Sequence, residues 1–196
     1  MAAANRKYLA PTLTSRPSPA AGEGNVVSAQ SRRDCAPQTR SPRFQAKLDT
    51  PFALVGIRTE GEELAEIVFL PRSAGALAPA NALAERACMQ IERYAADPEY
   101  RFALPLKTLG TAFQRRVWEQ IAAIPCGQTR SYGDLARALK NAPRAVGQAC
   151  GTNYFPLVIP CHRVVAATGL GGFAHASGGY LLEVKRRLLL HETRAD

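Results

Sequence analysis

The chain contains few of the residues that build disulfide frameworks and metal sites. It has 196 residues and five cysteines, an odd number without a repeated spacing, so a disulfide framework is not expected and a reducing compartment is. All three histidines fall within the last 35 residues, far along the chain from Cys35 and Cys88. A structural zinc site usually needs four Cys or His ligands, so we expect no metal site in the first half of the chain.

Long apolar runs are also missing. No run approaches the ~20 residues that cross a bilayer as a helix, and no charged and then apolar signal peptide opens the chain. We therefore expect a soluble protein that does not contact a membrane and is located in the cytoplasm.

Positive charge, by contrast, is abundant, with a formal net charge of +9 at pH 7. Lys and Arg outnumber Asp and Glu by 8 to 2 in residues 1–47 and by 12 to 5 in residues 107–196, whereas residues 48–106 are acidic, with 5 against 9. The excess is thus not confined to one tail. A basic C-terminal half beside an acidic middle is typical of a protein that binds nucleic acid with one face.

Composition and periodicity divide the chain into three segments. Residues 1–45 are rich in Ala, Pro, Ser, Arg and Gln, which predicts a disordered basic extension. Residues 46–106 predict a small α+β domain, with strands at 51–58 and 66–70, a turn at 59–63 and a helix at 79–95. This domain carries no motif, so we interpret it as a scaffold for the functional domain of residues 107–196.

The functional domain is predicted to be mainly helical. An apolar stripe predicts a helix over 111–124, and Ser131 is the expected N-cap of a second helix, with Asp134 completing a capping box. Pro143 suits the first turn of a third helix. Two short helices joined by a tight turn indicate a helix-turn-helix, although any helical hairpin would give the same pattern. The basic charge of this half favours DNA binding.

The third helix carries few of the side chains that read base edges in the major groove. It carries small residues, among them Ala145 and Gly147, and one long cation, Arg144, at its start. A smooth helix with a single inserting side chain predicts binding that follows DNA shape rather than sequence. An enzyme that scans DNA for damage needs this kind of binding.

A thiol and an imidazole stand side by side in the chain. The apolar run 157–159 predicts a short buried strand that ends at Pro160, directly before Cys161 and His162. The neighbouring His162 and Arg163 can both favour the thiolate, the reactive form of cysteine. The alternative is that Cys161 is a small buried hydrophobe, as most single cysteines are. A final helix is predicted at 180–192, and from its position in the sequence alone Glu192 is expected to be a solvated carboxylate.

Several ordered motifs are similar to those of the O6-alkylguanine-DNA alkyltransferases, also called methylated-DNA–protein-cysteine methyltransferases. The resemblance covers residues 107–192 and, more loosely, the region from residue 50. It rests on the sequences IPCHRVV at 159–165, FQRRVW at 113–118, IPCGQTRSY at 124–132 and RAVG at 144–147, together with Asn153, Lys185, His191 and Glu192. It implies an α+β fold, in which a small RNase H-like N-terminal domain precedes a helical domain with a winged-helix-like helix-turn-helix.

The resemblance also implies a role for individual residues. Cys161 is the expected alkyl acceptor, His162 takes its proton through a bridging water, and Glu192 orients the imidazole. Asn153 is expected to tie the turn after the recognition helix to the loop of the active site. Tyr132 rotates the phosphate and donates to the guanine, and Arg144 fills the gap left by a flipped base. The implied DNA-binding set is Ser131, Tyr132, Arg144, Ala145 and Gly147, and the implied pocket set is Val164, Val165, Phe173 and Ser177.

The implied reaction is an irreversible transfer of a methyl or larger alkyl group from O6-alkylguanine in double-stranded DNA to Cys161, with O4-alkylthymine as a second candidate substrate. The thioether product cannot be dealkylated by water, so each molecule acts once. No cofactor is required because the damaged DNA is the alkyl donor. We expect a monomer that acts on DNA of any sequence, at the nucleoid.

Two segments depart from the family pattern, and two other classes of protein remain to be considered. The hairpin between Tyr132 and Arg144 is about two residues shorter than in some members, from which we expect only a tighter turn. The loop GFAHASGGY at 172–180 has Phe173 where a tyrosine is expected and about two extra residues, which alters the expected pocket wall. A Cys-His thiol hydrolase would turn over acyl or peptide substrates and would have no use for a DNA-binding half. A module that only recognises alkylated guanine would lack the thiol, which is present here.

Overall fold

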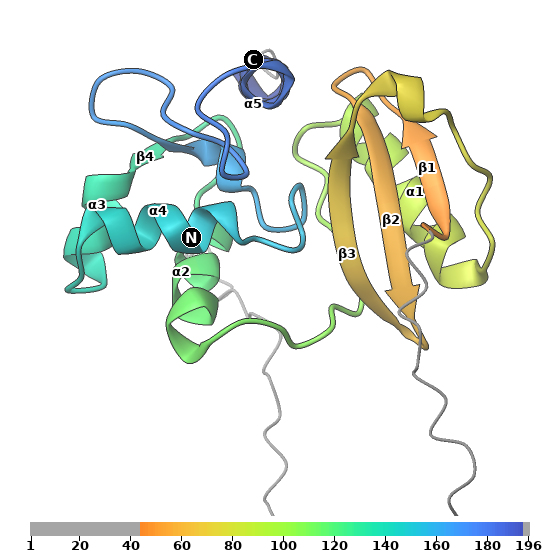
Figure 1. The fold of residues 1–196 in the computed structure, drawn as a ribbon, viewed down its shortest axis with the longest axis horizontal. Helices are drawn as coiled ribbons and strands as arrows, with labels where there is room; N and C mark the ends of the chain where they lie inside the picture. Colours follow the sequence, from red (N-terminus) through yellow and green to blue (C-terminus); the bar gives the residue numbers. More distant parts are fainter. Residues whose placement is uncertain (1–43, 194–196) are drawn as a thin grey trace, which may run out of the picture. The chain divides into compact units, whose positions relative to one another are not determined.

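A computed structural model describes residues 44–193 of the chain (Figure 1). The predicted extension at residues 1–45 therefore lies almost wholly outside the described residues, as does Cys35. Within the described residues, the chain forms three strands and a helix, and then a mainly helical half. This α+β composition agrees with the prediction from the sequence.

The first half is a three-stranded antiparallel sheet covered by one helix. The strands β1 (Ala46–Asp49), β2 (Leu54–Glu60) and β3 (Glu63–Leu70) pair in the order β1-β2-β3. A short 3-10 helix, η1 (Arg72–Ala74), and the helix α1 (Ala82–Ala96) follow. Figure 1 shows α1 lying across the sheet, and apolar side chains of both bury one another in the core.

These strands confirm the predicted pair and extend it. The turn between β2 and β3 is shorter than the predicted 59–63, because Gly61 adopts a left-handed φ of 58° and lets the chain reverse over two residues. The helix begins three residues later than predicted, since the Asn81 side chain accepts from the Ala84 amide and caps it there. Strand β1 was not predicted, because only four residues pair, and an alternation of apolar and polar residues over so short a run is a weak signal.

The second half contains four helices and a two-strand parallel pair. The helices are α2 (Ala112–Ala122), α3 (Tyr132–Ala138), α4 (Pro143–Gly151) and α5 (Tyr180–Thr193). Each of α2 and α3 begins with a capping box, formed by Thr111 with Gln114 and by Ser131 with Asp134. The predicted cap at Ser131 and the predicted proline at the first position of α4 are both confirmed.

The predicted strand at 157–159 is wrong. Leu157 has a left-handed φ of 78°, and the Ile159 amide donates to the Phe155 carbonyl at 2.8 Å, so this apolar run forms a buried turn. The strand β5 (Val164–Val165) follows the Cys-His pair instead, after a 3-10 helix, η2 (Cys161–Arg163). It pairs in parallel with β4 (Arg130–Ser131), which fixes the start of α3 beside the loop that carries the cysteine.

Two hydrogen bonds join β3 of the first half to the second half of the chain. The Ile67 amide of β3 donates to the Tyr154 carbonyl at 2.8 Å, and the Tyr180 hydroxyl donates to the Phe69 carbonyl at 2.7 Å. Within the helical half, the Trp118 indole donates to the Ala149 carbonyl at 2.8 Å and ties α2 to α4. The end of α4 and the start of α5 are therefore both held against β3. No helix between residues 44 and 193 is long and apolar enough to cross a membrane.

Candidate functional site

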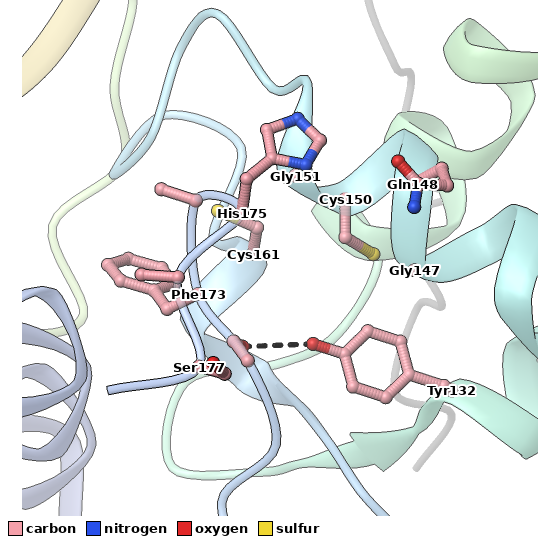
Figure 2. A pocket seen from close by; sticks show the side chains of 12 residues that line it. Tyr132, Gly147, Gln148, Cys150, Gly151, Cys161, Phe173, His175 and Ser177 are labelled. Carbon is pink, nitrogen blue, oxygen red and sulfur yellow. Dashed lines mark hydrogen bonds between the residues drawn. The ribbon is translucent and has the colours of Figure 1, made fainter.

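Cys161 lies at a pocket between α4 and the loop that precedes α5 (Figure 2). The thiol residue is 5% exposed and opens η2. The pocket has a volume of about 290 Å³ and is lined by Tyr132, Gly147, Gln148, Cys150, Gly151, Cys161, Gly172, Phe173, Ala174, His175, Ala176 and Ser177. A nucleophilic atom is thus held by buried backbone at the edge of a space that can admit a small planar ligand.

Burial raises the pKa of the Cys161 thiol, and two neighbours oppose that rise. The Asn153 side chain hydrogen bonds to the thiol and the charge of Lys185 lies near it, and both lower its pKa. His162 and Arg163, which follow the thiol in the chain, both direct ring or guanidinium nitrogens towards Glu192. The guanidinium of Arg163 donates to Glu192 and, at 2.5 Å, to the Ile124 carbonyl.

Glu192 accepts hydrogen bonds from three buried or half-buried side chains. Nε2 of His162 lies 2.7 Å from Oε1, the Tyr94 hydroxyl donates to Oε1 at 2.8 Å, and Nε and Nη2 of Arg163 donate at 2.9 and 2.8 Å. The Glu192 side chain is 1% exposed. It is therefore not the solvated carboxylate that its spacing in the sequence suggested.

Burial and the charges of this cluster together set the protonation state of the His162 imidazole. Burial acts to raise the pKa of Glu192, but the hydrogen bonds from His162 and Arg163 and the charge of Arg163 outweigh it and lower the pKa to about 2. Burial lowers the pKa of His162 despite the carboxylate, so the ring is neutral at pH 7. A neutral ring that donates Nε2–H to Glu192 leaves its lone pair on Nδ1. That atom is buried and has no hydrogen-bond partner among the described residues.

Asn153 fixes the loop between α4 and the cysteine. Its Nδ2 donates to the Ile159 carbonyl at 2.8 Å, and its Oδ1 accepts from the Phe155 amide at 3.0 Å. The side chain therefore bridges the two ends of the turn that leads into Pro160 and Cys161. This contact connects the end of α4 to the loop of the cysteine.

Tyr132 faces the pocket from the first turn of α3. Its hydroxyl donates to the Gly172 carbonyl at 3.0 Å, as Figure 2 shows. Burial, together with the thiols of Cys150 and Cys161, raises its pKa to about 12, so the phenol stays protonated and able to donate. The hydroxyl can exchange the carbonyl for a ligand that enters the pocket.

Lys185 binds β5 and the pocket loop together, a role that its position in the sequence did not predict. Its ammonium group is completely buried and donates to the carbonyls of Val164, Leu170 and Gly172 at 2.6, 2.7 and 2.9 Å. Burial lowers its pKa to about 8. The lysine holds the pocket loop against β5. Its place between Val184 and Leu188, which are both buried, was the available sign that it is not a surface lysine.

The structure brings some of the predicted pocket residues together and leaves others outside. Phe173 and Ser177 line the pocket, whereas Val164 and Val165 are not among its lining residues. Both valines lie in β5, where Val164 is buried in the core and Val165 is half-buried. The sequence analysis missed the lining residues Gln148, Cys150 and His175, because helical and loop spacing did not show which side chains face the thiol.

The predicted DNA-binding residues lie on α3 and α4 or directly before them. Arg144 is exposed in the first turn of α4, Ser131 and Ala145 are half-buried, and Gly147 borders the pocket. As for metals, no three His, Cys, Asp or Glu side chains within residues 44–193 are close enough to hold an ion.

The fold and the site define a protein that has a buried thiol in a pocket beside a pair of short helices, and comparison with known proteins identifies its family. Residues 112–194 match the model of the 6-O-methylguanine DNA methyltransferase DNA binding domain. A methylated-DNA–protein-cysteine methyltransferase from Mycobacterium leprae is 36% identical over 129 residues, which cover 62% of this chain and 78% of that protein. The chain belongs to the methylated-DNA–protein-cysteine methyltransferase family.

Two further relatives show how far the similarity extends. The protein of the same name from Archaeoglobus fulgidus is 44% identical over 84 residues, which cover 43% of this chain and 57% of that protein. The chain thus spans less than two thirds of the length of this relative. A crystal structure of Mycobacterium tuberculosis OGT in complex with DNA has a TM-score of 0.63 and 32% identity, and the match covers 76% of this chain and 92% of that one.

Proposed function

We propose that the protein repairs alkylated DNA by transferring the alkyl group of O6-alkylguanine to Sγ of Cys161, once per molecule. The observation that carries this proposal is the pocket that holds Cys161 between Tyr132, α4 and the loop 172–177, with the buried pair of His162 and Glu192 beginning at the next residue of the chain. The M. tuberculosis relative binds DNA, and the family membership extends that partner to this chain.

The proton leaves the thiol along the buried side of the site. Nδ1 of His162 is the ring nitrogen that is free to accept it, through a bridging water, because Nε2–H is donated to Glu192. The charge of Glu192 stabilises the imidazolium that forms, and Arg163 and Tyr94 keep the carboxylate in place. Asn153 and Lys185 stabilise the thiolate. These groups together offset the cost of creating a buried anion.

The thiolate then attacks the alkyl carbon in line with the bond to O6. The S–C bond forms as the C–O6 bond breaks, and the electron pair of that bond goes to the guanine. The protonated Tyr132 donates a hydrogen bond to the departing base, and the proton that His162 took from the thiol passes to the base through solvent, so the products are S-alkylcysteine and guanine and both side chains return to their starting states. The thioether sulfur is neither a leaving group nor a substrate for hydrolysis, which limits each chain to one transfer. No cofactor takes part.

DNA is bound by the half that contains α3 and α4. We interpret residues 46–106 as an RNase H-like scaffold, and residues 107–196 as a winged-helix-like domain in which these two helices form the helix-turn-helix. The small residues Ala145 and Gly147 let α4 approach the duplex, and the exposed Arg144 fills the space of the flipped base. The binding is therefore independent of sequence. We propose that the protein acts as a monomer.

A transfer assay tests this proposal. A duplex oligonucleotide that contains O6-[³H]methylguanine is incubated with the protein, and the labelled peptide is identified after digestion. We expect label on Cys161, complete loss of labelling in Cys161→Ser, and unchanged labelling in Cys126→Ser, a matched change at a half-buried cysteine outside the pocket. Label transferred to Cys161→Ser, or none to the folded natural protein, would overturn the proposal.

A further inference from the structure

The pocket loop contains a tight turn that is conformationally strained. The amide of Phe173 donates to the Ala176 carbonyl at 2.9 Å, and the amide of Ala176 donates to the Phe173 carbonyl at 2.8 Å. Both residues between them have left-handed backbones, with φ of 47° at Ala174 and 63° at His175. Glycine or asparagine is usual in such turns, so two other residues carry a conformational cost here.

The strained turn places the ring of His175 against α4. A Cβ atom added at Gly151 would lie 2.5 Å from Nδ1 and from Cε1 of this ring, and 2.9 Å from Nε2. The backbone of Gly151 itself needs no glycine, since it is helical. The glycine instead provides the space in which the imidazole lies. Figure 2 shows the ring of His175 directed towards Gly151.

The rest of the loop is anchored independently of this contact. Phe173 is buried and packs on Phe69, with ring centroids 5.6 Å apart, and the Gly172 carbonyl accepts from Tyr132 and Lys185. The other lining residues of the turn, Ala174, Ala176 and Ser177, are small. The imidazole of His175 is therefore the bulky group with which the exposed part of the loop borders the pocket of Cys161.

We propose, on the basis of the function assigned above, that His175 is a specificity-determining residue. Its ring, seated on Gly151, closes the pocket between the loop and the end of α4 and limits the size of the alkyl group that can reach the thiol. We call this ring the wall of the pocket. A methyl group fits in the pocket beside the wall, whereas the wall hinders the entry of a substituent as large as a benzyl group.

Two substitutions test the wall from its two sides. His175→Ala removes the ring. Gly151→Ala places a methyl group in the space that the ring occupies and so moves the exposed ring towards solvent. Because alanine forms helices better than glycine, this substitution should not weaken α4. Gly178→Ala is the matched control, because a Cβ there meets nothing within 4 Å. His175→Asn provides a shorter side chain that tolerates the left-handed backbone, should the alanine variant fold poorly.

The measured quantity is the ratio of the transfer rates from O6-benzylguanine and O6-methylguanine in the same duplex. We expect this ratio to rise about tenfold or more in His175→Ala and in Gly151→Ala, and to stay constant in Gly178→Ala. A ratio within about twofold of the natural protein in either pocket variant, or an equal rise in the control, would overturn the proposal.

A second measurement does not depend on the proposed reaction. Cys161 is alkylated with iodoacetamide or with N-benzyl-iodoacetamide in the absence of DNA, and its modification is followed by peptide mass spectrometry. If the ring is a wall, the ratio of the alkylation rate with N-benzyl-iodoacetamide to that with iodoacetamide rises in both pocket variants. Equal ratios in all variants would refute the wall. Absence of methyl transfer by the natural protein would refute the proposed function instead.

Discussion

The charge of Glu192 makes a contribution to stability that can be worked out from the structure. Its pKa falls from the usual 4.5 to about 2, in a side chain that is 1% exposed. Each pKa unit corresponds to about 1.4 kcal/mol, so the ionised carboxylate contributes about 3 kcal/mol to the free energy of unfolding at pH 7. Glu192→Gln keeps the shape and removes the charge, which leaves Arg163 without its counter-charge.

The sign of the pH dependence follows from the direction of the pKa change. Because the folded pKa is lower than the unfolded one, the contribution is complete above about pH 4.5 and is lost as the pH falls towards 2. We therefore expect Glu192→Gln to be about 3 kcal/mol less stable than the natural protein at pH 7, and this difference to shrink steadily below pH 4.5.

Urea unfolding of both proteins between pH 7 and pH 3 measures this difference. Glu183→Gln is the matched control on the same helix, since Glu183 is an exposed carboxylate that pairs with Arg186 and Arg187, and its removal should change stability little. A difference for Glu192→Gln below about 1 kcal/mol at pH 7, or one that stays constant down to pH 3, would refute the account of this cluster.

Three further changes have defined outcomes. Lys185→Met removes the donor to three carbonyls, of which that of Gly172 keeps another donor, the Tyr132 hydroxyl, and should lower the free energy of unfolding by about 3 kcal/mol in urea; an unchanged value would contradict this. Asn153→Ala removes a hydrogen bond that lowers the pKa of the Cys161 thiol, so alkylation by iodoacetamide at pH 7 should slow, and a faster reaction would refute the role. Tyr132→Phe should slow methyl transfer about a hundredfold in single-turnover assays while the melting temperature stays the same; transfer at the natural rate would show that the phenol does not donate.

The sequence predicted the elements whose formation depends on local patterns. The capping box at Ser131, the proline that opens α4 and the apolar stripe of α2 are all set by neighbours within a few residues, and the structure contains them. The run 157–159 was misread because a short apolar stretch suits a strand and a buried turn equally, and only tertiary packing decides between them.

The electrostatics of the site could not be predicted in the same way. Sequence proximity suggested that Arg163 acts on the neighbouring thiol, whereas its guanidinium pairs with Glu192 29 residues away. Tyr94 reaches the same carboxylate from the other half of the chain, across 98 residues. Such contacts depend on how the two halves pack, and no local pattern encodes them. Resemblance to a family pointed to Glu192, but gave no indication of Tyr94.

The central claim is that Cys161 accepts one alkyl group and then stops. The most direct test is the intact mass of the protein after incubation with excess duplex containing O6-methylguanine, followed by a second addition of duplex. The account predicts one methyl per chain, located on Cys161 by peptide mapping, and no further consumption of substrate after the second addition. More than one methyl per chain, a methyl on another residue, or continued turnover would contradict it.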